Sequence, residues 1–432
     1  MAAAMSDDPQ PVTTVTDGVQ RMSMNDNTAS YVKMNHDQGK ETMENMLKRN
    51  NAAINDLTAC AKALKEIRRL SEDLKTISAI VQCEGLLPKL EAILTKCKDQ
   101  QLQIEAAWIL ANVAASPCTL HTKMVVDLGV IPTLLSLVKA PSSVAELKHT
   151  CLDVLSNIAG DSAKYRDILF DAGCVNDIMT LYQQRNISDD NFTWMLRAFC
   201  SHIKPPPKWD HVKDIVPVMV RTAASTFSSD KSIGFAVAAI YDLCWSHEEE
   251  ICKQLTKDGK VSEFVKLIEH KTMVVRQEMI TVWAHLMTTK DDTFVELAIK
   301  HGLLNSLVKT LHSSIETRMV LMCIANITAS EKQIQAAIDC KGLVQSVIMV
   351  ADVKKDPKIQ MEAVVVLLNI CLYGDANQVK TLMFYGAAFV LHAYVNEFAH
   401  CLVPHPNVAD SERALLRMKN LSIGIADQKE IL

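Results

Sequence analysis

The sequence predicts an all-α fold built from stacked helical repeats, and three observations lead to this prediction. The 432 residues include only 13 glycines and 13 prolines. Both counts lie below the average usage of about 7% and 5%, which favours helices joined by short loops. Aromatic residues make up 5% of the chain and methionines number 20, a composition that favours aliphatic helix–helix packing over a β-sandwich. Finally, two sequence patterns recur along the chain with one common period.

The first pattern is a glycine followed by a short apolar stretch with helical character. Seven copies occur, and their glycines are 40 to 44 residues apart except for one gap of 86, which is twice 43. Pro217 lies where the missing copy is expected, and proline can begin a helix in place of the glycine. The copies are GLLPKLEAIL from Gly85, GVIPTLLSLV from Gly129, GCVNDIMTLY from Gly173, GKVSEFVKLI from Gly259, GLLNSLVKTL from Gly302, GLVQSVIMVA from Gly342 and GAAFVLHAYV from Gly386.

The second pattern is a longer helical segment, such as EAAWILANVAAS from Glu105 and TCLDVLSNIAGD from Thr150. One aligned position recurs in these segments at spacings of 41 to 45 residues. It is occupied by Asn112, Asn157, Ala198, Asp242, His285, Asn326 and Asn369. Two independent patterns that share a period of about 43 residues predict a helical solenoid of HEAT or armadillo type.

The periodicity also predicts the domain organisation. Residues 1–50 lack the pattern and are rich in Ser, Asp, Asn, Thr and Met, so we expect a disordered arm there. Residues 51–432 are expected to form the solenoid, in which each repeat buries the apolar face of its neighbours.

Composition and motif searches argue against several classes of function. The net charge of −5 disfavours a globally basic nucleic-acid binder, and the apolar runs are far shorter than a membrane span of about 20 residues. No C-x-x-C, H-E-x-x-H, G-x-S-x-G or glycine-rich phosphate loop occurs. We therefore expect no enzyme, metal site or cofactor, and we expect the 13 cysteines to be free thiols in a reducing compartment.

Several motifs in order resemble importin-α proteins, over roughly residues 50–398. They are EAAWILANVA from Glu105, GVIPTLLSLV from Gly129, NIAGDSAKYRD from Asn157, TWMLRAFCSHIKPPP from Thr193 and ANITAS from Ala325. The resemblance implies a right-handed armadillo-repeat superhelix, here of about eight to nine repeats. It further implies an adaptor that binds basic nuclear-localisation peptides in a concave groove, moves between cytoplasm and nucleus, and is carried by importin-β.

Residue types along the long segments fit such a groove. Glu105, Trp108 and Asn112 are spaced i, i+3 and i+7, which places them on one helix face. An Asn amide both donates and accepts, as an extended peptide backbone requires, and an indole face attracts a Lys or Arg side chain. The resemblance assigns Asp161 as the acid that receives a key lysine. The predicted peptide-binding residues are Glu105, Trp108, Asn112, Asp153, Asn157, Asp161 and Trp194.

The sequence departs from the family pattern in three places. Trp108 with Asn112 is the one complete Trp–Asn pair, because Asp153 replaces the next tryptophan. A second peptide site retains Asn326, Glu362 and Asn369 but no tryptophan, so we expect it to be weak. The N-terminal arm carries five basic and seven acidic residues instead of the family's dense basic helix. We interpret it as a degenerate importin-β-binding region and expect importin-β binding there to be weak or absent. An interaction with the family's export receptor stays open.

Two functions are compatible with the sequence. The first is an importin-α-like adaptor that recognises nuclear-localisation-type basic peptides for nuclear protein import, in the cytoplasm and the nucleus. The alternative is a diverged armadillo scaffold that binds another, non-basic protein partner and has lost cargo transport. The intact segment from Asn157 to Asp167 and the pair Trp108–Asn112 favour the first function, whereas the broken tryptophan column and the weakly basic arm favour the second.

Overall fold

The computed structural model describes residues 43–56, 59–201, 204–312, 316–351, 356–398 and 407–429, and every regular element within these ranges is helical. The described residues divide into two compact units, an N-terminal one that ends at Ile215 and a C-terminal one that begins at Val216. The predicted all-α solenoid is therefore confirmed. The predicted boundary at residue 50 falls inside α1 (Met43–Ala53), where Leu47 and Asn50 are buried, and residues 1–42 of the predicted arm lie outside the described residues.

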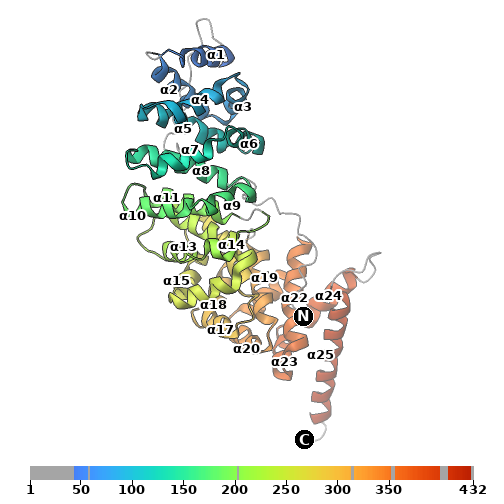
Figure 1. Cartoon of the computed structure of the whole chain (residues 1–432). Helices are drawn as coiled ribbons and strands as arrows, with labels where there is room; N and C mark the ends of the chain where they lie inside the picture. Colours follow the sequence, from blue (N-terminus) through green and yellow to red (C-terminus); the bar gives the residue numbers. More distant parts are fainter. Residues whose placement is uncertain are drawn as a thin grey trace. The chain divides into compact units, whose positions relative to one another are not determined.

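The N-terminal unit is a stack of repeats, each with two short helices and one long helix (Figure 1). The long helices α2, α5, α8 and α11 pack against one another in sequence order, and the short helices cover one side of them. After α1 the elements are α2 (Cys60–Ser71), α3 (Leu74–Gln82), α4 (Leu86–Lys96), α5 (Gln100–Ala114), α6 (Thr119–Asp127), α7 (Val130–Lys139), α8 (Ala145–Ala159), α9 (Ala163–Asp171), α10 (Cys174–Gln183), α11 (Asp189–Cys200) and α12 (Trp209–Val212).

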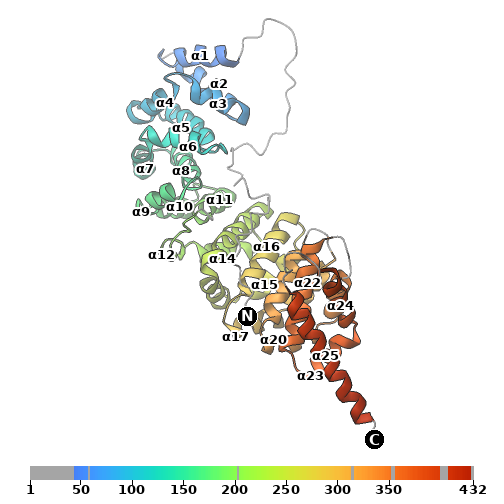
Figure 2. The same ribbon diagram turned by 90° about the vertical axis from the view of Figure 1, so that its right-hand side faces the viewer.

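The C-terminal unit repeats this arrangement around the long helices α14, α16, α19 and α22, and α25 lies against α22 and α24 (Figure 2). Its elements are α13 (Val216–Ala223), α14 (Asp230–Lys257), α15 (Val261–Lys266), the 3₁₀ turn η1 (Leu267–Glu269), α16 (Met273–Leu286), α17 (Asp292–Lys300), α18 (Leu303–Thr310), α19 (Thr317–Thr328), α20 (Glu331–Asp339), α21 (Leu343–Ala351), α22 (Pro357–Tyr373), α23 (Ala376–Phe384), α24 (Ala387–Phe398) and α25 (Val408–Lys429).

The glycine pattern has a conformational cause. All seven of its glycines have positive φ angles, between 62° and 92°, in the turn that precedes the second short helix of each repeat. This left-handed conformation is open to glycine and strained for residues with a Cβ atom, so one glycine per repeat marks the same turn. The copy that begins at Val216 and Pro217 uses proline in the first turn of α13 instead.

Aliphatic side chains form the core of both units, as the composition predicts. On α5 eleven of fifteen residues are buried, because this helix is covered by its own short helices and by the long helices on either side. Twelve cysteines in the described ranges are free, and eight of them are buried. No single described helix has the length and apolar character needed to cross a membrane, although the bent pairs α6–α7 and α20–α21 meet the criteria of length and composition.

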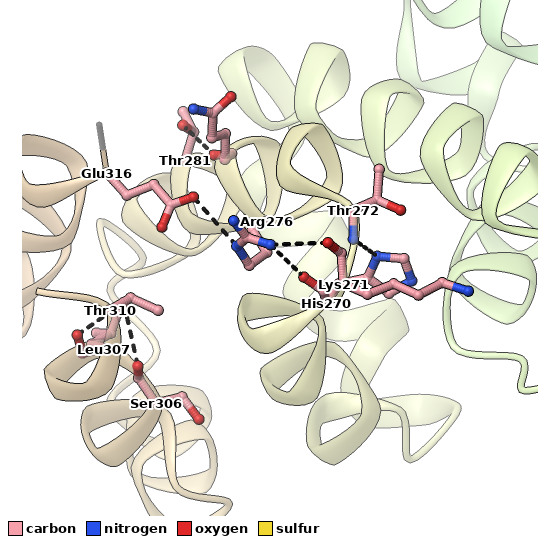
Figure 3. Close-up of polar contacts among 10 residues, drawn as sticks. His270, Lys271, Thr272, Arg276, Thr281, Ser306, Leu307, Thr310 and Glu316 are labelled. Carbon is pink, nitrogen blue, oxygen red and sulfur yellow. Dashed lines mark hydrogen bonds and ion pairs between the residues drawn. The ribbon is translucent and has the colours of Figure 1, made fainter. Parts of the chain in front are cut away.

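At several points an arginine ties a long helix to a neighbouring repeat, and Figure 3 shows the example at Arg276. Its Nη1 atom donates to the carbonyl oxygens of His270 at 2.9 Å and Lys271 at 3.1 Å, just before α16. Its Nε atom lies 3.4 Å from Oε1 of Glu316, which is 4% exposed and precedes α19. At the end of α22, Arg417 of α25 donates to the carbonyl oxygens of Cys371, Leu372 and Gly374 at 2.6 to 2.8 Å.

Candidate functional site

The sequence-predicted residues fall into one group in each unit. Most lie on the long helices, and side-chain caps fix the starts of α5, α11 and α22. Asp99 accepts a hydrogen bond from the backbone of Gln101 at the start of α5, and Ser188 accepts one from Asn191 at the start of α11. In the N-terminal unit Glu105, Trp108 and Asn112 lie on α5, Asp153 and Asn157 on α8, and Trp194 on α11, while half-buried Asp161 follows α8. In the C-terminal unit Asn326 lies on α19, and Glu362 and Asn369 lie on α22.

The asparagine column of the N-terminal unit forms bonds between repeats. Nδ2 of Asn112 donates to Oγ of Ser71 on α2 at 2.8 Å, and Nδ2 of Asn157 donates to the carbonyl oxygen of Ala111 on α5 at 3.1 Å. Both side chains are buried, with exposed fractions of 4% and 3%. One amide hydrogen of each therefore stabilises the stack, and the sequence alone did not indicate this use.

The same arrangement recurs in the C-terminal unit. Nδ2 of Asn326 donates to the carbonyl oxygen of Ala284 at 2.8 Å, and Nδ2 of Asn369 donates to the carbonyl oxygen of Ala325 at 2.9 Å. In each case the acceptor is the residue just before the aligned position of the preceding repeat. The constant spacing was the available signal for these bonds, because residues one repeat apart are neighbours in a solenoid.

Both predicted glutamates are paired with arginines of the preceding repeat. Nη1 of Arg68 on α2 lies 3.4 Å from Oε2 of Glu105, and the guanidinium carbon lies 4.2 Å from the centroid of the Trp108 ring. Nε of Arg318 on α19 lies 3.3 Å from Oε1 of Glu362. Burial raises the pKa of Glu362, while the nearby guanidinium lowers it. Sequence reasoning missed these arginines, since they do not recur at one aligned position.

Asp153 occupies the position where the family pattern has tryptophan, and its carboxyl group is almost entirely buried. The residue is 1% exposed, and neither carboxyl oxygen has a hydrogen-bond partner among the described residues. Burial raises the pKa of this carboxyl well above its usual range, which favours the protonated form. Nε2 of His149 lies 3.8 Å from Oδ1, and burial lowers the pKa of this imidazole, so the pair does not act as an ion pair at neutral pH.

A small pocket lies between α8 and α11, beside Asn157. Three of its lining residues have a buried polar atom without a hydrogen-bond partner among the described residues: Oγ of Ser156, Oδ1 of Asn157 and Nε of Arg197. Trp194 forms part of the wall and is 4% exposed, so its ring offers little surface for stacking. The remaining lining residues are Gly160, Ala198 and Ser201. Such a pocket can accept and donate hydrogen bonds to a small polar group.

Comparisons with known proteins agree with this fold. The family model described as armadillo/beta-catenin-like repeat matches residues 118–160. Importin subunit alpha-2 of Arabidopsis thaliana is 29% identical over 196 residues, which is 44% of this chain and 34% of the relative. Importin subunit alpha-1a of Oryza sativa subsp. japonica is 28% identical over 276 residues, which is 61% of this chain and 49% of the relative.

A crystal structure of an engineered protein matches with a TM-score of 0.72 at 22% identity, over 89% of this chain and 92% of that one, and this likeness concerns the fold. The aligned regions of the two curated relatives cover between a third and half of their length. Together with the repeats described above, these matches show that the chain is an armadillo-repeat protein that is similar to, and divergent from, importin α subunits.

Proposed function

We propose that this armadillo scaffold binds an extended basic protein segment along the face formed by α5, α8 and α11, as an adaptor for nuclear-localisation-type peptides in nuclear protein import. The observation that carries the proposal is the cluster of unsatisfied polar atoms at α8 and α11. Both oxygens of Asp153, Oγ of Ser156, Oδ1 of Asn157 and Nε of Arg197 are buried and lack hydrogen-bond partners among the described residues. Buried polar atoms are normally satisfied, so such a cluster suits an external polar ligand.

The chemistry of these groups matches a peptide with a basic side chain. Oδ1 of Asn157 can accept a hydrogen bond from a peptide N–H group, and Nε of Arg197 can donate one to a peptide carbonyl. The carboxyl group of Asp161 is the acid proposed to receive a lysine ammonium group. The buried carboxyl group of Asp153, whose protonated form is favoured, can exchange hydrogen bonds with a polar group of the ligand. Because the helices already hold these side chains in place, little conformational entropy is lost by the protein on binding.

A second, weaker peptide site is proposed in the C-terminal unit at Asn326, Glu362 and Asn369. The pair between Glu362 and Arg318 supports the expected weakness, since a ligand cation would have to compete with a guanidinium that is already bound. The proposed adaptor would act in both cytoplasm and nucleus. The proposal involves importin-β only by a route other than the N-terminal arm, and it leaves the export receptor open as a partner.

A scaffold for a non-basic protein partner is the second candidate, and one observation favours it. Arg68 and Arg318 already neutralise Glu105 and Glu362, the two glutamates expected to attract basic side chains. A face whose acids are paired internally has less charge with which to select a basic ligand.

Fluorescence anisotropy with a labelled lysine-rich peptide tests the proposal. We expect binding at micromolar concentration that weakens with added salt and weakens at least tenfold in Asn157→Ala. The matched control is Asn176→Ala on α10, where the same side chain is exposed, and its affinity should equal that of the wild type. If no protein binds at tens of micromolar, basic-peptide recognition is excluded and the non-basic scaffold becomes the better description.

A further inference from the structure

Arg68 occupies the position that a basic ligand side chain would take at Trp108 and Glu105. Its guanidinium lies over the indole ring at 4.2 Å and 3.4 Å from the carboxylate. Glu105 is 3% exposed and Trp108 is half-buried, whereas the Arg68 side chain is 28% exposed. The cation that fills this subsite thus belongs to the chain itself and remains partly in contact with solvent.

The two contacts define the chemistry of the subsite. A flat guanidinium can stack on an aromatic face and donate hydrogen bonds to a carboxylate at the same time. Glu105 is deeply buried, and a buried charge without a partner is strongly unfavourable, so this position calls for a positive partner. A ligand that binds at Trp108 and Glu105 therefore has to supply a cation. The guanidinium of Arg68 has to leave the subsite when that cation binds.

The position of Arg68 makes such an exchange feasible. Among the described residues, Glu105 is the one hydrogen-bond partner of its guanidinium, and that contact is long at 3.4 Å. A single long contact is weaker than the bidentate fork that arginine forms with a well-placed carboxylate. Because the side chain is partly exposed, it can move into solvent without crossing the core.

We propose that Arg68 is a built-in competitor at the Trp108–Glu105 subsite, so that a lysine or arginine side chain of a bound peptide enters only by replacing it. This inference rests on the proposed function. It implies that Arg68 weakens the binding of a basic peptide, because the peptide has to displace it. Exchange of one cation for another keeps Glu105 paired throughout and leaves the net charge of the subsite unchanged. Removing the resident cation is expected to tighten the binding of a basic peptide.

Anisotropy titrations with the same labelled peptide test the exchange. Arg68→Gln keeps a donor for Glu105 but removes the cation, and we expect binding to tighten on the order of tenfold, as displacement of one cation–π contact implies. The matched control is Arg69→Gln, which removes the same charge from the exposed next position of α2 and should change the affinity less than twofold. In a Trp108→Leu background, Arg68→Gln should lose most of its effect.

Each outcome decides between the two proposals. Equal affinities for wild type, Arg68→Gln and Arg69→Gln would overturn the competitor role while leaving peptide binding intact. Tighter binding by Arg68→Gln than by the wild type would support both proposals. Binding by Arg68→Gln alone would support the competitor role and overturn basic-peptide recognition by the wild type, and binding by none of the proteins would overturn both. If circular dichroism shows that Arg68→Gln is not folded, Arg68→Lys carries the test, since it retains the charge, loses the flat stacking group and should tighten binding severalfold.

Discussion

Nδ2 of Asn157 on α8 donates to the carbonyl oxygen of Ala111 on α5 across 3.1 Å, so the side chain placed at the centre of the candidate site also joins two repeats. The other end of the same amide, Oδ1, has no hydrogen-bond partner among the described residues. In this one amide, Nδ2 stabilises the contact between two repeats, while Oδ1 is available to accept a hydrogen bond from a ligand. Substitutions at this position should affect stability and binding together, and the two effects have to be measured separately.

Asn157→Ala should lower the free energy of unfolding. Loss of the bond from Asn157 leaves the carbonyl oxygen of Ala111 with the backbone N–H of Ala115 as its remaining donor, and removing one such hydrogen bond typically costs about 0.5–1.5 kcal/mol. Urea unfolding followed by circular dichroism measures the change, with Asn176→Ala as the exposed control. An unfolding midpoint equal to that of the wild type would show that the bond contributes nothing to the stack.

Asp153→Asn should stabilise the protein, and increasingly so as the pH rises. Burial raises the pKa of the folded-state carboxyl above its unfolded value of about 3.9, so the folded state holds this proton more tightly. The stability from this group is complete below the unfolded pKa and is lost as the pH rises through the folded pKa. The amide does not titrate and removes that loss, so the stability difference in favour of Asp153→Asn should be larger at pH 7 than at pH 5.

Urea midpoints between pH 5 and pH 8 check this expectation. The difference between Asp153→Asn and wild type should grow across this range, while the control Asp127→Asn, at an exposed aspartate, should show a constant difference. A constant difference for Asp153→Asn as well would mean that its carboxyl does not titrate abnormally.

Arg276→Met should destabilise the C-terminal unit more than the double substitution Arg276→Met with Glu316→Leu. The single change leaves the nearly buried carboxylate of Glu316 without its partner, which costs on the order of 2 kcal/mol after allowance for the partial exposure of Arg276. The double change removes both charges. A thermal-denaturation cycle of the four proteins gives the coupling energy, and additive effects would contradict a functional ion pair.

Arg417→Met should loosen the end of α22. The guanidinium satisfies the carbonyl oxygens of Cys371, Leu372 and Gly374, which otherwise have no helical donor at this terminus. Hydrogen exchange should accelerate at least tenfold in the last turn of α22, whereas Arg413→Met, at an exposed arginine one turn earlier on α25, should leave it unchanged. If hydrogen exchange is unchanged in Arg417→Met, groups other than the Arg417 guanidinium must stabilise the end of α22.

The repeats could be predicted from the sequence because each one needs the same turn. A positive φ strongly favours glycine, as at Gly129, so the preference appears in the sequence at a fixed period. The long helix of each repeat is equally visible, because its buried positions recur. One boundary was less visible: α14 runs through His247, where φ and ψ leave the helical range, and neither glycine nor proline marks this kink.

The site was predicted less completely than the fold. Asn112 and Asn157 were recognised as a column, but periodicity does not say whether an amide faces a ligand or a neighbouring helix. The partners Arg68 and Arg318 occupy different positions within their repeats, so no period revealed them. Burial of Trp194 likewise depends on how α8 and α11 pack, which residue spacing alone does not determine.

The free cysteines give the stack a chemical property of its own. Eight of the twelve described thiols are buried, and they are distributed from α2 to α22. Burial raises the pKa of Cys252 to about 12 and that of Cys371 to about 11. Little of the reactive thiolate form is therefore present while the repeats are folded and packed. Oxidants and alkylating reagents should therefore spare these sulfur atoms until a repeat opens, and the order in which cysteines are labelled would record the order in which the repeats come apart.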